Sequence, residues 1–224
     1  FWTGEFHLSW EDIPDWALDE AKLLLEEVRK VDLHTFEHCC RVGRGSRRLA
    51  KAMGLNEFEQ AVLEFSGLFH DIGKAKIPVE ILTKPSRLDK DEIEVMKSHP
   101  IKSAEMVARH DDEAFFRFLL PGVKFHHEKV DGTGYPYGLK GDEIPLFARL
   151  ISIVDTFDAM TQQRVYRKAL SREKAIAELL DFSGRQFDPQ LVRIFVDLLP
   201  HWEHEAKKAE REELVIASIL KKAA

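Results

Sequence analysis

Residues His126–Pro136 have the sequence HHEKVDGTGYP, and the other polar motifs of the chain can be understood in relation to this stretch. Its first part places two histidines beside a glutamate and an aspartate, a set of side chains that can bind a metal ion. Its second part, Gly132–Pro136, is typical of a rigid, exposed turn. A complementary motif lies upstream, at His70–Lys74 (HDIGK). We expect the two stretches to meet around a dinuclear metal site.

The composition indicates one globular domain with extensions, because 224 residues, 44% of them hydrophobic, can form one sizeable core. The net charge of -6 argues against binding along a DNA or RNA polymer, but it allows a local basic pocket for one phosphorylated ligand. Cys39 and Cys40 are adjacent, so we predict no disulfide framework, a packing role for both side chains and a reducing, cytoplasmic location.

The ends of the sequence indicate a piece of a longer protein, because the chain starts at Phe1 rather than at methionine. No run approaches the roughly 20 apolar residues of a membrane span, and no signal peptide precedes the domain. An upstream sensory, receiver or membrane-tethering module is compatible with this interpretation.

Hydrophobic residues recur at helical spacing and show no strand alternation, so we predict an all-α fold. Helices are expected to begin near Asp12, Leu33, Asn56, Leu88, Glu113, Pro145, Ser171 and Asp188. Residues 79–84 and 128–145 are expected to be loops. Proline should break a helix at Pro100, interrupt another at Pro121-Gly122 and end a third near Leu199-Pro200.

Candidate metal ligands gather at the predicted helix ends. The histidines concerned are His34, His38, His70, His99, His126 and His127. Imidazole and carboxylate without thiolate suit iron, manganese, nickel or zinc better than magnesium or calcium. Asp71 follows His70 directly, and on a helix the two side chains point about 100° apart. The two side chains can serve one metal only near a helix end, or Asp71 can bridge two metals about 4 Å apart, which together assist a phosphoryl displacement.

Three cations are candidates for binding phosphate. Lys74 shares a helix face with His70 if the helix continues past Gly73, and it can act as a point charge. Arg164 and Arg167 can each clamp a phosphate through two hydrogen bonds. Taken singly, each of these side chains is more often a solvated surface charge.

These motifs resemble a known family. His70–Lys74 resembles the signature of the HD phosphohydrolase superfamily, and His126–Pro136 resembles the extended signature of its HD-GYP branch. The similarity covers roughly residues 31–200. It continues through the segments 139–141, 144–145, 148–149, 154–159, 164–170 and 187–189.

The resemblance implies an HD-domain helical bundle with additional helices and a long Gly/Pro-rich GYP loop. Residues 31–200 would form the catalytic domain, 1–30 a flanking segment with a linker-like helix, and 201–224 an amphipathic C-terminal helix. HD-GYP proteins are cyclic di-GMP phosphodiesterases, which use a metal-bridged hydroxide to form pGpG and often GMP.

The resemblance also implies a role for each candidate residue. One metal would be held by His38, His70, Asp71 and Asp155, and the other by Asp71, His99, His126 and His127. The metals would be iron or manganese in the first place, with nickel or zinc as alternatives. Lys74 would contact the scissile phosphate, Arg164 and Arg167 would hold the nucleotide phosphates, and Tyr135 would line the base or ribose.

The remaining assignments concern residues around the metals. Asp158 would orient a ligand, and Glu128 would support the site rather than act as a base. Asp131 belongs to a loop that contacts partners such as GGDEF domains in the family. His34 stands where some members have a glutamate that binds a third metal, so a third ion is compatible but not implied. Val165 replaces a common proline.

Several alternatives stay open at this point. The substrate could be another cyclic dinucleotide, or the chain could be a non-catalytic receptor or an interaction module that acts through the GYP loop. Some HD proteins are dinuclear iron oxygenases, but the phosphate-binding candidates Lys74, Arg164 and Arg167 weigh against that activity. A homodimer is compatible with the sequence.

Overall fold

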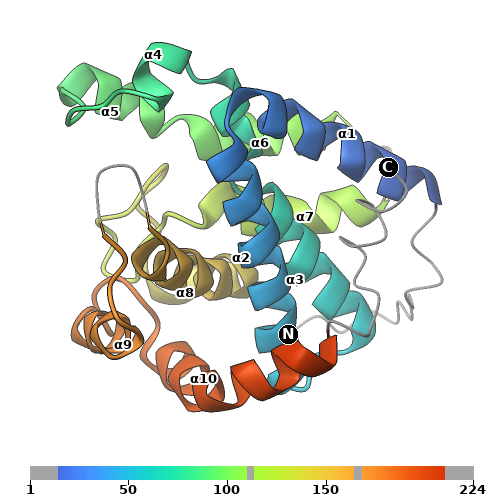
Figure 1. Ribbon diagram of the computed structural model, residues 1–224, viewed down its shortest axis with the longest axis vertical. Coiled ribbons are helices and arrows are strands. Elements are labelled where there is room, and N and C mark those ends of the chain that lie inside the picture. The colour runs from blue at the N-terminus through green and yellow to red at the C-terminus, as the bar shows by residue number, and fades with distance from the viewer. Residues whose placement is uncertain (1–14, 110–113, 164–167, 210–224) are drawn as a thin grey trace.

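The computed structural model describes residues 15–109, 114–163 and 168–209, and its regular elements in these ranges are all helical (Figure 1). The all-α prediction is therefore confirmed. The elements are α1 Asp15–Val31, α2 Leu33–Ala52, α3 Glu57–Phe69, η2 Ile72–Lys76, α4 Val79–Leu82, α5 Lys90–Met96, α6 His99–Ala108, α7 Ala114–Phe125, η3 Gly141–Glu143, α8 Leu146–Thr161, α9 Arg172–Asp181 and α10 Pro189–Ala209.

Local capping side chains set several helix starts. Asp32 accepts hydrogen bonds from the backbone N–H groups of His34 and Thr35 at the start of α2. Asn56 and Asp89 each form a reciprocal capping box, with Glu59 and Glu92 respectively. These starts lie where the sequence predicted them. The predicted start near Asp12 falls outside the described residues.

Three expectations about helix breaks were wrong. Residues 79–84 contain the short helix α4, α7 continues through Pro121, and α10 continues through Pro200 to Ala209. In α7, packing against α3 compensates for the backbone hydrogen bond that Pro121 cannot donate. Gly122 makes this packing possible, because it lets the helix approach α3. A Cβ at Gly122 would lie 2.8 Å from Ser66 Cβ. The break expected at Pro100 lies just before it, since α5 ends at Met96 and α6 begins at His99, with Pro100 in its first turn.

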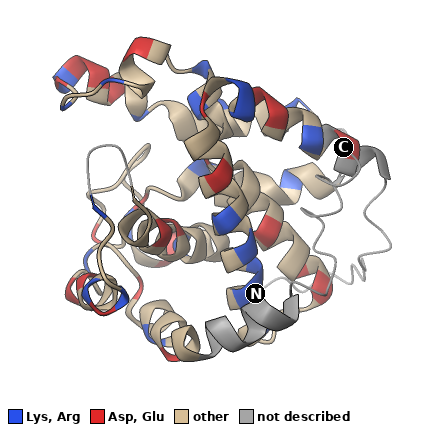
Figure 2. Ribbon diagram, viewed as in Figure 1, with Lys and Arg blue, Asp and Glu red and all other residues tan. Residues whose placement is uncertain are grey.

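Two hydrophobic cores share the central helices α2 and α3. The first joins them to α1, α6 and α7 and includes Phe65, Phe69, Phe116 and Leu119. The second joins them to α8, α9 and α10 and includes Leu49, Leu63, Leu150 and Phe195. Figure 1 shows α2 running between these two sets of helices. Charged residues of both signs alternate along the outer helices α1, α5 and α9 (Figure 2).

Among the described residues, no helix combines the length and the apolar composition needed to cross a membrane. Cys39 and Cys40 are both free and buried, as their predicted packing role requires. Of the predicted C-terminal helix, residues 201–209 continue α10, and 210–224 lie outside the described residues.

Glycines allow α2 and α3 to cross at close range. A Cβ at Gly43 would lie 2.7 Å from Leu68 Cγ, and a Cβ at Gly67 would lie 3.1 Å from Gly43 Cα. The crossing is close to His38 in α2 and to His70, which directly follows α3, and the two ring centroids are 5.2 Å apart. This close approach therefore places two candidate ligands from different helices beside each other.

We predict that Gly67→Ala lowers the free energy of unfolding by about 1–3 kcal/mol, because the added methyl group overpacks the α2–α3 crossing. Urea denaturation measures the effect. Lys51→Ala, on the exposed surface of α2, is the control and should change stability by less than about 0.5 kcal/mol. Equal stability of Gly67→Ala and wild type would contradict the tight crossing.

Candidate metal centre

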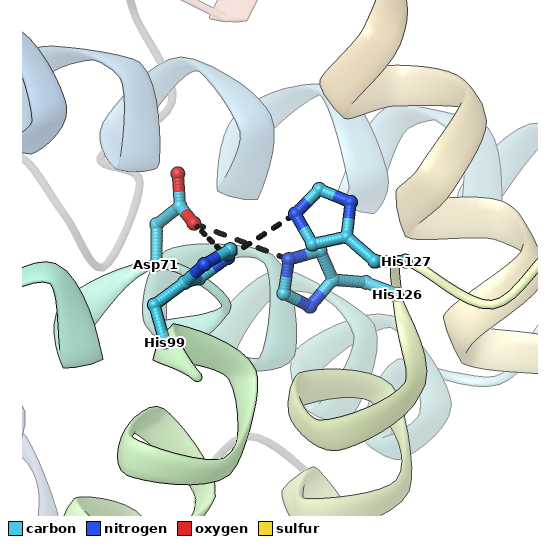
Figure 3. A group of neighbouring side chains, drawn as sticks. All are labelled: Asp71, His99, His126 and His127. Carbon is cyan, nitrogen blue, oxygen red and sulfur yellow. Dashed lines mark hydrogen bonds and ion pairs between the residues drawn. The ribbon is translucent and has the colours of Figure 1, made fainter. Parts of the chain in front are cut away.

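Seven of the predicted ligands converge in two groups. The first group is His38 from α2, His70 at the end of α3 and Asp155 from α8; the second is Asp71, His99, His126 and His127. Within each group the ligand atoms all lie within 4.8 Å of one another. Figure 3 shows the second group, in which three imidazoles from two separate segments turn toward the Asp71 carboxylate.

Asp71 lies between the two groups. Its Oδ1 is 3.0 Å from His99 Nε2 and 4.0 Å from His126 Nε2. Its Oδ2 is 3.7 Å from His38 Nε2 and 3.4 Å from His70 Nε2. One carboxylate thus directs one oxygen toward each set of histidines, which is the arrangement of a bridging ligand.

Helix ends orient three of the histidines. The Nδ1 atoms of His70, His99 and His126 donate to the carbonyl oxygens of Gly67, Met96 and Val123, at 2.7, 2.8 and 2.8 Å. These carbonyls belong to the last turns of α3, α5 and α7, where the helix itself provides no i+4 donor. Because a carbonyl only accepts, each Nδ1 carries the proton and each Nε2 presents a lone pair to the centre.

His38 is held differently, because it lies inside α2, where the backbone carbonyls are engaged in the helix. Its Nδ1 is 2.7 Å from Asp158 Oδ2 of α8, and its Nε2 is 3.0 Å from Asp155 Oδ1. Arg41 Nε donates to Asp158 Oδ1 at 2.8 Å, and Arg41 Nη2 donates to Oδ2 at 3.1 Å. Asp158 therefore orients His38. Arg41 was missed, although its i+3 spacing from His38 was a usable signal.

The polar atoms at the centre fit a bound cation. His70 Nε2, His126 Nε2 and Asp71 Oδ1 are buried without a hydrogen-bond partner in the described part of the chain. Such atoms are costly to bury unless something compensates them. His99 Nε2 and His127 Nε2 are 3.1 Å apart. Two nitrogens bound to one metal ion at ~2.1 Å and at right angles to each other would be about 3.0 Å apart.

The protonation states also suit metal binding. Burial lowers the pKa of His127 to about 3 and also lowers the pKa values of His70 and His126, so these imidazoles stay neutral. Burial lowers the pKa of His38 as well, but its hydrogen bonds to Asp155 and Asp158 outweigh this effect and raise the pKa to about 9. Binding of a metal ion at His38 would therefore release a proton.

The two carboxylates stay ionised despite their burial. Burial favours the neutral form of Asp71, but Lys74 and the neighbouring histidines together outweigh it and hold the pKa well below the usual range. Burial acts in the same direction on Asp155, where the hydrogen bond and the charge of His38, together with the other nearby histidines, outweigh it and lower the pKa. Both groups can thus act as anionic ligands.

Lys74 lies beside the centre, but on a 3-10 helix rather than on a continuation of α3. The helix does not continue past Gly73, because α3 ends at Phe69 and the 3-10 helix η2 follows. Lys74 pairs with Asp71 Oδ2 from this 3-10 helix. Gly73 allows this path, since a Cβ there would overlap the backbone of His99 and Ser103.

The segment after His127 is anchored by Glu128. The buried Glu128 carboxylate accepts hydrogen bonds from the backbone N–H groups of Tyr137 at 2.7 Å and Leu139 at 3.0 Å. The Tyr135 ring stacks on His127, with centroids 4.7 Å apart and planes at 25°. Asp131 is exposed and accepts from the N–H and hydroxyl of Thr133. Glu128 thus holds the GYP loop against the centre.

The other predicted site residues lie apart from these groups or cannot be placed. His34 is exposed, one turn before His38, and belongs to neither ligand group among the described residues. Arg164 and Arg167 lie outside the described residues. Their predicted contacts with phosphate therefore stay predictions.

The architecture is thus an all-α domain around a buried His/Asp cluster. The sequence profile of the HD domain family matches residues 22–191, and the chain belongs to this family. The resemblance to its HD-GYP branch is also confirmed by the curated relatives. A cyclic di-GMP phosphodiesterase of Thermotoga maritima is 36% identical over 197 residues, covering 87% of this chain and 52% of that protein.

A second relative and a solved structure extend the comparison. The 3'3'-cGAMP-specific phosphodiesterase 2 of Vibrio cholerae is 37% identical over 180 residues, covering 80% of this chain and 34% of that protein. The chain therefore spans about half, or less, of these relatives. The crystal structure of a cyclic GMP-AMP-specific phosphodiesterase of Vibrio cholerae has a TM-score of 0.61 at 21% identity, covering 91% of this chain and 52% of that one, and supports the fold.

We predict that Glu128→Gln speeds hydrogen exchange at the backbone amides of Tyr137 and Leu139. A glutamine has one acceptor oxygen in place of two, so one of the two part-buried N–H groups loses its partner, at a cost of about 1 kcal/mol. Hydrogen exchange followed by mass spectrometry checks this local opening. The exposed Glu105→Gln is the control and should exchange like wild type. Unchanged protection in Glu128→Gln would refute the anchoring role.

Proposed function

We propose that this chain is the catalytic part of a metal-dependent phosphodiesterase that hydrolyses cyclic di-GMP. The observation that carries the proposal is the position of Asp71, with one carboxylate oxygen directed toward each histidine group. The activities in the names of the relatives support it, since these proteins are phosphodiesterases of cyclic dinucleotides.

In this proposal the two ligand groups hold two transition-metal ions, iron or manganese in the first place. His38, His70 and Asp155 bind one ion, His99, His126 and His127 bind the other, and Asp71 bridges them. Ions bound there would activate water and stabilise the charge that develops on the phosphodiester. The neutral imidazoles, the anionic carboxylates and the uncompensated Nε2 atoms support this assignment. His34 is the candidate ligand for a third ion.

The chain's own groups bind and orient the substrate. The Lys74 ammonium is held beside Asp71, where it can contact the scissile phosphate and hold a proton near the leaving oxygen. The Tyr135 ring, stacked on His127, offers an aromatic face to a base or ribose. Arg164 and Arg167 are proposed to bind the remaining phosphate charge.

Cyclic di-GMP is the first candidate substrate, and a mixed cyclic dinucleotide is the second, because one relative is specific for 3'3'-cGAMP. The proposed product is pGpG, with GMP after a further cleavage. We propose residues 31–200 as the catalytic domain and the GYP loop as a contact for a GGDEF-type partner. Control by an upstream sensory or receiver domain, and a homodimer, are compatible with this proposal.

We expect Asp71→Ala to lose both metal binding and activity, because neither ligand group is complete without the bridging carboxylate. Purified wild type should contain about two transition-metal ions per chain and should convert cyclic di-GMP to pGpG or GMP. Elemental analysis and product chromatography check both statements. A metal-replete, reduced wild type without turnover on any cyclic dinucleotide would rule out the enzymatic proposal.

Lys74→Ala should retain the metal ions but lower kcat by roughly 10²–10³-fold, because it removes a cation from the scissile phosphate rather than a metal ligand. Lys76→Ala is the matched control, since Lys76 lies in the same 3-10 helix but pairs with Glu27 at the surface. Steady-state kinetics with parallel metal analysis separate the two effects. Loss of metal in Lys74→Ala, or equal kinetics of both variants, would disprove the assigned role.

A further inference from the structure

One ligand, His38, distinguishes the two halves of the metal centre, because it is not oriented by a backbone carbonyl. In the half formed by His99, His126 and His127, backbone carbonyls of helix ends orient His99 and His126 through hydrogen bonds within the same segment. In the other half, His38 takes its orienting acceptor from Asp158, a residue on another helix. The position of the His38 ring therefore depends on a contact between side chains of α2 and α8.

A carboxylate on a flexible side chain needs its own support to orient a ring. Asp158 receives this support from Arg41, whose Nε and Nη2 donate to its two oxygens at 2.8 and 3.1 Å. Such a two-point contact fixes both the plane and the position of the carboxylate. Arg41 lies one turn after His38 on the same face of α2. Both side chains therefore contact Asp158 of α8, and together the three residues connect the two helices.

We infer that Arg41 is a positioning residue for one half of the metal centre: it fixes Asp158, Asp158 fixes the His38 ring, and His38 Nε2 is thereby directed at the ion held with His70 and Asp155. This inference rests on the proposed dinuclear centre. The other half does not depend on Arg41, because backbone carbonyls orient His99 and His126. Loss of Arg41 should therefore weaken one metal site selectively.

The test uses Mn²⁺ added to the metal-stripped chain, with wild type, Arg41→Gln and Arg41→Lys compared. Bound manganese is measured by titration and elemental analysis, and electron paramagnetic resonance distinguishes a coupled pair of ions from a single ion. Arg44→Gln is the matched control, because Arg44 is the next arginine of α2 and is also partly buried. Circular dichroism monitors the fold of each variant.

Wild type and Arg44→Gln should bind two Mn²⁺ ions with the spectrum of a coupled pair. In Arg41→Gln one site should weaken about 10–100-fold, so that the spectrum becomes that of a single ion near the concentration that saturates wild type. Arg41→Lys should recover part of the loss, since lysine supplies the charge but not the two-point contact.

A double-mutant cycle with Asp158→Asn tests whether Arg41 acts through Asp158. If it does, Arg41→Gln should have little further effect on Mn²⁺ affinity when Asp158 is already asparagine. Additive losses would overturn the inference, as would equal weakening of both sites or an unchanged coupled pair in Arg41→Gln. A wild type that binds no pair of ions would overturn the proposed function and this inference together.

Discussion

The structure depends on the burial of one carboxylate, Asp71, among histidines that present lone pairs to it. Burying such groups is unfavourable unless a cation compensates them. Asp71 Oδ1, His70 Nε2 and His126 Nε2 have no hydrogen-bond partner in the described part of the chain, and the pairing of Asp71 with Lys74 involves its other oxygen. The centre is therefore a preorganised set of ligands, and the surrounding helices hold the ligand side chains in position.

Backbone packing sets the precision of this centre. The crossing of α2 and α3 at Gly43 and Gly67 brings His38 and His70 together. Gly73 lets η2 lie on the start of α6, which places Asp71 beside His99. Gly134 packs on the backbone of residues 127–129, where any side chain would collide. This contact holds the GYP loop close to the segment that contains His127. At these close contacts a larger residue would displace a ligand.

The ligand set and the surroundings have separate roles in the proposed reaction. Relatives named for cyclic di-GMP and for 3'3'-cGAMP both match most of this chain. In the proposed reaction, the buried ligands would hold the metal ions, and selectivity between bases would come from groups beyond the metals, such as Tyr135 on the GYP loop. Such groups can change without disturbing the buried histidines, because Glu128 anchors the loop separately.

The sequence alone determined the helical class, because helix periodicity and capping are local properties. It also indicated candidate ligands, through the chemistry of imidazole and carboxylate and through the resemblance to the HD-GYP branch. It could not determine that α7 continues through Pro121, since this depends on the contact of Gly122 with α3. Nor could it show that Lys74 pairs with Asp71, or that Arg41 supports His38 through Asp158. The tertiary structure decided these three features, because α7 depends on packing against α3, the Lys74 pairing depends on where α3 ends, and the support by Arg41 joins residues far apart in the chain.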